Sequence, residues 1–102
     1  MPDRLAKISE FYTEAFAHYD RKRTPPPVNV EFYPYIGINH TIRIRSGGAF
    51  VRLTELCQDM PAEEQRSLAY ILVSKLYRRK APKWMRERYA DFIKSDEIRL
   101  SS

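Results

Sequence analysis

Apolar and polar residues alternate along this chain with two periodicities, that of an α-helix in some segments and that of a β-strand in others. The longest helical stretch covers residues 61–80, where apolar side chains recur about every 100° around a helix axis. Pro61 suits a first helical turn, and Glu63 and Glu64 stand where the helix dipole favours anions. The apolar stripe is broad, so we expect this helix to be largely buried and the other elements to pack against it.

The same spacing predicts two further helices. Residues 3–22 carry one apolar face, and the three prolines that follow, residues 25–27, end that helix and form a stiff, extended connector. A third helix is expected over residues 83–94, because Pro82 ends the central one just before it.

Strict alternation predicts three strands between the first and the central helix, at residues 28–33, 40–45 and 50–53. Gly47-Gly48 separates the last two and is typical of a two-residue hairpin turn. The order helix, three strands, helix, helix predicts an α+β domain. Its helices should cover one face of a small sheet that includes an antiparallel pair.

Taking Gly47 and Gly48 as the loop sets the register of the hairpin. Arg43 then lies opposite Arg52, and like charges opposed in this way cost roughly a few tenths of a kcal/mol or more. The apolar face of the hairpin comprises Ile42, Ile44, Val51 and Leu53. The other face comprises Arg43, Arg45, Phe50 and Arg52. We expect this second face either to meet an acidic partner or nucleic-acid phosphate, or simply to extend its arginines into solvent.

Composition narrows the class of protein. A length of 102 residues corresponds to one domain with a modest core. No apolar run reaches the roughly 18 residues of a membrane span, and the charged N-terminus is unlike a signal peptide, so no membrane partner is expected. The single Cys57 excludes an internal disulfide. It is expected to be a buried structural thiol in a cytoplasmic protein.

The chain is basic, with 18 Lys and Arg against 13 Asp and Glu and a net charge of +5. Such a charge favours contact with polyanions, although soluble domains that bind no nucleic acid often carry it too. Arg78, Arg79 and Lys80 form a basic run at the end of the central helix. This run and the arginine-bearing hairpin face are the candidate binding residues.

Metal and cofactor sites are not expected. His18 and His40 are isolated from each other and from any paired carboxylate or cysteine cluster. Ser67 and Ser74 have no histidine near them in the sequence, although a catalytic triad can be assembled from distant parts of a chain.

Four segments resemble the SprT-like metalloprotease domain in their order and spacing. They read FYTEAF from Phe11, PPVNVE from Pro26, HTIRI from His40, and the helical stretch 68–77. The resemblance covers residues 4–80. It implies a zincin-like fold, in which a helix and a small sheet precede a helix that bears H-E-x-x-H, and a third zinc ligand follows.

The zinc motif of that family is absent at the position that the resemblance indicates. Tyr70 and Ser74 stand where the histidine pair would be, and Ile71 stands where the glutamate would be. These side chains cannot hold zinc at that spacing, so no catalytic residue is carried over. The resemblance implies a non-catalytic domain that binds polypeptide at an edge of its sheet, or that holds a partner protease domain.

Two alternatives stay open. Some bacterial proteins carry a zinc-less copy of this domain ahead of an intact one, and the chain is either such a first copy or a protein without a second. The alternative function is a small basic nucleic-acid-binding module. A salt titration separates the two functions, because phosphate contacts make binding steeply dependent on salt.

Overall fold

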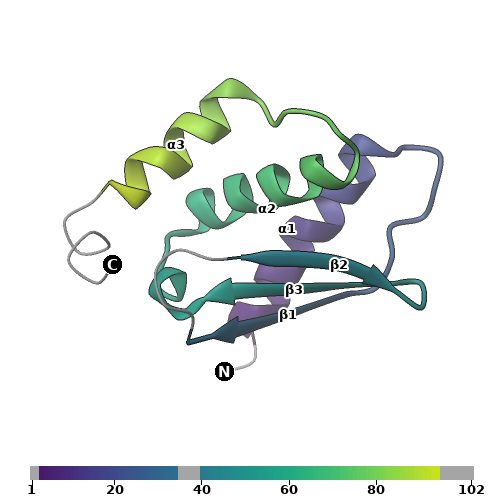
Figure 1. The fold of residues 1–102 in the computed structure, drawn as a ribbon, viewed down its shortest axis with the longest axis horizontal. Helices are drawn as coiled ribbons and strands as arrows, with labels where there is room; N and C mark the ends of the chain where they lie inside the picture. Colours follow the sequence, from purple (N-terminus) through teal and green to yellow (C-terminus); the bar gives the residue numbers. More distant parts are fainter. Residues whose placement is uncertain (1–2, 35–39, 95–102) are drawn as a thin grey trace.

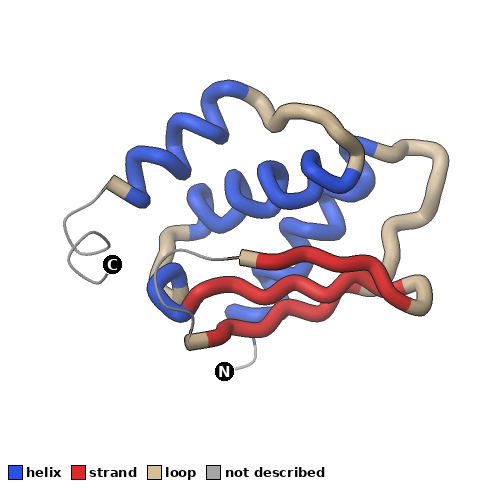
Figure 2. The backbone as a smooth tube through the Cα atoms, viewed as in Figure 1, coloured by secondary structure: helices blue, strands red, loops and turns tan. Residues whose placement is uncertain are grey.

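The computed structural model describes residues 3–34 and 40–94, which form three α-helices, three β-strands and one short 3₁₀ turn (Figures 1 and 2). In chain order these are α1 (Asp3–Tyr19), β1 (Val28–Tyr33), β2 (Thr41–Arg45), β3 (Gly48–Thr54), η1 (Glu55–Cys57), α2 (Ala62–Leu76) and α3 (Lys83–Ile93). The predicted α+β class is confirmed. No helix within these residues is long and apolar enough to cross a membrane.

The middle strand of the sheet is β3, and the strand order is β1-β3-β2. β3 pairs with β1 in parallel and with β2 antiparallel. The chain therefore passes from the edge strand β1 to the edge strand β2, and the hairpin then leads into the central strand β3. The central position explains why Ala49, Val51 and Leu53 are almost completely buried. The alternate residues of β3 point away from the core, as the period of a strand requires.

All three helices lie on one side of the sheet (Figure 1). α1 and α2 contact each other and the strands, and α3 packs against α2. The core between these layers contains Tyr12 from α1, Leu53 from β3, Leu68 from α2 and Met85 from α3. No element of the described chain covers the opposite face of the sheet.

The central helix ends earlier than predicted, at Leu76 rather than at residue 80. Arg78 adopts a left-handed conformation with φ of 55°, and the Arg79 amide donates to the Ser74 carbonyl at 2.9 Å. This arrangement closes a helix by satisfying its last carbonyl groups. The periodic pattern misses the end because a non-glycine residue with positive φ is uncommon.

The hairpin turn is formed by Ser46 and Gly47, not by Gly47 and Gly48 as predicted. Both turn residues have positive φ, 51° and 79°, which is what the tight turn of a two-residue hairpin requires. Gly48 already belongs to β3 and pairs with Arg45. The prediction erred because it gave both positive-φ positions to glycine, whereas the serine occupies one of them.

The corrected turn shifts the register of the hairpin by two positions along β3. Every side chain therefore keeps its predicted face, but its neighbours change. Arg43 lies opposite Phe50, and Arg52 lies opposite Thr41. The prediction that Arg43 lies opposite Arg52 is therefore wrong. The repulsion expected between these two arginines does not arise.

Candidate functional site

The uncovered face of the sheet carries most of the binding residues that the sequence predicts. Phe50 and Arg52 stand on β3, Arg43 and Arg45 on β2, and all four are exposed. Together with three neighbours they line a hollow of about 470 Å³. We call this surface the outer face; the residues that line its hollow are Glu31, Thr41, Arg43, Arg45, Ser46, Phe50 and Arg52.

Arg52 is held in place by two residues of β1. Its Nε lies 3.5 Å from Oε1 of Glu31, the residue paired with it across the parallel strands. Its guanidinium carbon lies 4.3 Å from the centre of the Tyr33 ring, a cation–π contact. Half of each ion-pair side chain is exposed to water, so the pair orients Arg52 more than it stabilises the fold.

Arg43 and Arg45 differ from Arg52, because no acidic residue in the described part of the chain pairs with either of them. Phe50 lies between these arginines and β1, and its side chain is 43% exposed. A Cβ on Gly48 would stand 3.6 Å from Cε2 of Phe50, so the ring leans along β3 over the glycine. The outer face thus combines an exposed aromatic ring with two cations that form no ion pair with any described residue.

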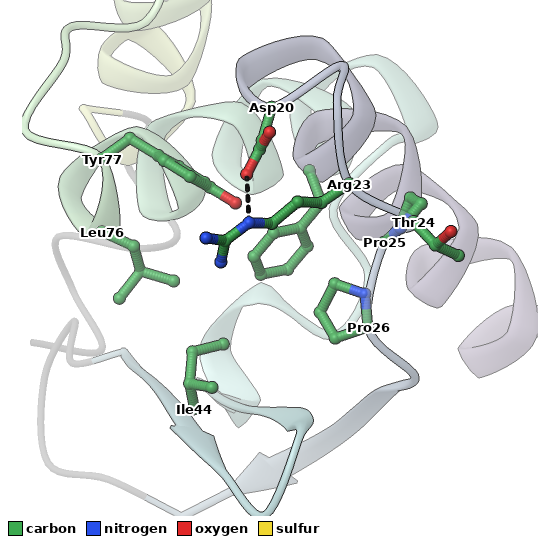
Figure 3. A pocket seen from close by; sticks show the side chains of 9 residues that line it. Asp20, Arg23, Thr24, Pro25, Pro26, Ile44, Leu76 and Tyr77 are labelled. Carbon is green, nitrogen blue, oxygen red and sulfur yellow. Dashed lines mark ion pairs between the residues drawn. The ribbon is translucent and has the colours of Figure 1, made fainter.

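A second candidate surface lies beside β2, the edge strand next to the helices. A hollow of about 350 Å³ opens between this strand, the connection from α1 to β1, and the end of α2 (Figure 3). Ile44 and Leu76 line it and are 49% and 39% exposed. Arg23 and Asp20, an ion pair 3.8 Å apart, also line it, and the Arg23 side chain extends in among the other lining residues (Figure 3). We call this region the edge hollow; it is lined by Phe16, Asp20, Arg23, Thr24, Pro25, Pro26, Ile44, Leu76 and Tyr77.

Tyr70, which the resemblance places at a histidine position of the zinc motif, lies in the interface between α1 and α2. Its hydroxyl donates to Oε2 of Glu14 at 2.7 Å. Arg66 donates to the same oxygen from Nη2 at 2.6 Å and from Nε at 2.8 Å. Arg66 therefore holds the pKa of Glu14 below its ordinary value, while burial and then Glu14 raise the pKa of Tyr70 to about 12.

The two other motif positions are also engaged in packing. Ser74 is buried, and its hydroxyl donates to the carbonyl of Ile71 at 2.6 Å. Ile71 is partly buried against the core. The structure therefore does not bring Tyr70, Ile71 and Ser74 together on an open cleft, which is where a peptidase keeps its ligands because substrate must reach the metal.

His40 joins the beginning of β2 to α3. Its Nδ1 accepts a long hydrogen bond of 3.4 Å from the Thr54 amide, so the ring proton lies on Nε2, which is 2.7 Å from the Tyr89 hydroxyl. Burial, with a smaller effect of Lys75, lowers the pKa of His40 to about 4. The imidazole is therefore neutral at pH 7 and serves as a structural link.

Cys57 is a buried structural thiol, as the sequence predicts. Cys57 is completely buried, and burial raises the pKa of its thiol to about 11, so it stays protonated at neutral pH. Among residues 3–34 and 40–94, no group of three His, Cys, Asp or Glu side chains could hold a metal ion. The absence of bound zinc in the purified protein stays a prediction, and metal analysis would test it.

The structure keeps the two predicted basic clusters apart. Arg78, Arg79 and Lys80 lie in the exposed connection between α2 and α3, on the helix side of the sheet (Figure 1). The outer face lies on the opposite side. The two clusters therefore do not form one continuous basic surface.

Sequence reasoning missed the edge hollow and the parallel strand pairing that places Glu31 beside Arg52. Both depend on contacts between segments far apart in the chain, and β1 reaches β3 only in a parallel pairing that local patterns do not reveal. One signal was present for the hollow. Ile44 and Leu76 are large apolar residues near the ends of their elements, where a small core has little room to bury them.

Comparison of the chain with protein-family models, curated proteins and solved structures finds no match.

Proposed function

We propose that this chain is a zinc-less, SprT-like binding module that holds an extended polypeptide along the open edge of β2. The observation that carries the proposal is that the outer edge of β2 pairs with no described strand and lies beside a mainly apolar hollow. The bound strand belongs either to a free polypeptide or to a partner protease domain. In both cases the module positions its ligand and performs no chemistry on it.

The zincin-like fold is part of the proposal. Its support is the order of elements, in which a helix and a small sheet precede a long buried helix, α2, and the helices share one face of the sheet. The antiparallel edge strand β2 contacts α2, so the open edge and the buried helix are neighbours.

The geometry of β2 suits strand addition. β3 pairs with one side of β2, and no described residue pairs with the other. An edge strand presents unpaired N–H and C=O groups that an incoming strand can match. The five residues of β2 span about 17 Å, which is the length of a typical strand.

The edge hollow provides a place for side chains of the incoming strand. Ile44 belongs to β2 itself, and Leu76 and Pro26 face the same space (Figure 3). Covering such apolar surface contributes about 25 cal/mol for each Å² removed from water. The backbone of β2 would then supply affinity for any extended chain, while the hollow would favour chains with apolar residues at alternate positions.

Binding of an unfolded polypeptide tests this function. The probe is fluorescein-labelled α-lactalbumin that has been reduced and carboxymethylated, and fluorescence anisotropy follows its binding. We expect Leu76→Lys and Ile44→Thr each to weaken binding about fivefold, because each removes apolar contact surface in the edge hollow. Both changes affect exposed side chains, so the folded structure should survive.

Leu5→Lys is the matched control. Leu5 is a leucine of similar exposure, 42%, on α1 and outside the edge hollow, so its replacement should leave the affinity unchanged. Equal losses in all three variants would indicate nonspecific hydrophobic binding and would contradict the proposal. Unchanged affinity in Leu76→Lys and Ile44→Thr would also contradict it.

A further inference from the structure

We propose that the outer face binds single-stranded nucleic acid, with Phe50 as a platform for a base and with Arg43 and Arg45 as contacts for the backbone phosphates. This site is separate from the edge of β2. Its existence does not depend on the polypeptide-binding function.

Phe50 is the first part of the argument. It stands on the central strand of an open face, where Asn29 and Arg43 are its neighbours across the sheet. Since the residue two positions before it, Gly48, has no side chain, the ring has room to lean along the strand. Exposed aromatic rings on the faces of small sheets are surfaces on which unpaired bases stack.

The arginines are the second part. Among the described residues, three arginines and one acidic residue, Glu31, line the hollow of the outer face, and Glu31 is already paired with Arg52. Arg43 and Arg45 therefore present uncompensated charge. They are two residues apart on one strand, so their Cα atoms are separated by about 6.8 Å. This separation is close to that of successive phosphates in an extended nucleic-acid strand.

The combination favours a single strand over the other anionic partners. A duplex keeps its bases stacked on one another, so Phe50 would find no free base to contact. An acidic protein segment would satisfy the arginines but would leave the exposed ring without a matching group. Only an unpaired strand offers both phosphates and open base faces.

The test is a salt titration of oligonucleotide binding, followed by fluorescence anisotropy. The probes are fluorescein-labelled oligo(dT) and oligo(U) of about 12 nucleotides, measured between about 50 and 200 mM KCl. We expect Phe50→Leu to weaken binding about tenfold at every salt concentration. We expect Arg43→Ala/Arg45→Ala to weaken binding and to reduce the slope of log K against log salt by about 1.4, since each phosphate contact contributes about 0.7 for a single strand.

Three control variants test whether the effects are specific to the outer face. Arg21→Ala/Lys22→Ala removes the same charge from an exposed site after α1 and should change the slope little. Trp84→Leu removes an aromatic ring of similar exposure, 49%, from α3 and should leave affinity unchanged. Phe50→Tyr keeps a stacking ring and should restore the affinity lost in Phe50→Leu. Circular dichroism of each variant confirms that it is folded.

Several results would overturn the proposal. Absence of binding at the lowest salt would do so, as would equal affinity for a duplex of the same length. Loss of binding in Arg78→Ala/Arg79→Ala with no effect of Arg43→Ala/Arg45→Ala would place the site on the connection after α2. Binding of poly-glutamate through the same arginines, unaffected by Phe50→Leu, would identify an acidic protein partner instead.

Discussion

Tyr70, which the resemblance places at a histidine position of the zinc motif, is a structural residue between α1 and α2. Its hydroxyl and the Arg66 guanidinium meet on one oxygen of Glu14, which ties α2 to α1. The carboxylate is more than a third exposed, so water screens the ion pair and its contribution to stability is modest. The role of the network is mainly to fix how the two helices face each other.

His40 gives a pH prediction at the same scale. Its pKa falls from 6.5 to about 4 on folding, so the unfolded chain binds the proton more readily between these values. The free energy of unfolding should therefore fall as the pH is lowered below 6.5, by about 1 kcal/mol for each pH unit until the folded-state pKa is reached. Above pH 6.5 this contribution is constant.

Urea denaturation at several pH values measures the effect. His40→Asn should be less stable at pH 7, because the hydrogen bond to Tyr89 is lost or altered, and its stability should depend less on pH between 6.5 and 4. His18→Asn, which removes an exposed imidazole of α1 that does not contact Tyr89, is the control for the substitution itself. An unchanged pH dependence in His40→Asn would refute the assignment.

At the scale of elements, the hairpin decides which side chains meet on the outer face. The turn at Ser46 and Gly47 pairs Arg43 with Phe50 and leaves Arg52 beside Glu31. The alternative turn would oppose two arginines. The observed turn therefore avoids that repulsion and places Phe50 beside Arg43, the arrangement on which the proposed nucleic-acid site depends.

Two alanine substitutions distinguish these turns. Gly47→Ala should destabilise the protein by about 1 kcal/mol, because an L-residue is strained at φ of 79° even though no atom lies within 4 Å of the new Cβ. Gly48→Ala should cost less than about 0.5 kcal/mol, since Gly48 has strand geometry and the nearest atom to a new Cβ is 3.6 Å away. Thermal denaturation measures both, and equal costs would argue against the observed turn.

Local patterns predicted the elements well and their partners less well. The alternation of Ile42 and Ile44 with Arg43 and Arg45 identified a strand and its two faces, and a register shift of two residues left those faces intact. The pairing of β1 with β3 could not be predicted from local patterns, because a parallel pair depends on the path of the chain between the two strands. The end of α2 was missed because Arg78 has a positive φ, which is uncommon for arginine and cannot be predicted from the residue type.

At the scale of the whole molecule, one small sheet presents two different surfaces. The inner face of the sheet packs against the core. The two surfaces are the outer face, which carries arginines and an exposed ring, and the β2 edge, which lies beside the edge hollow. The helix layer packs on the inner face, and α2 runs beside β2 (Figure 2). The two proposed sites can be occupied at once, because a strand added to β2 lies beside the outer face and not on it.

Amide hydrogen exchange measured by NMR, with and without the unfolded α-lactalbumin probe, tests the central claim most directly. The other edge strand, β1, provides an internal comparison within the same sheet. We predict that alternate amides of Thr41–Arg45 exchange about tenfold more slowly when the probe is bound, while the amides of Val28–Tyr33 are unchanged, because only β2 gains a new hydrogen-bonded neighbour. Unchanged exchange throughout β2 in the presence of saturating probe, or protection confined to β1, would contradict the account.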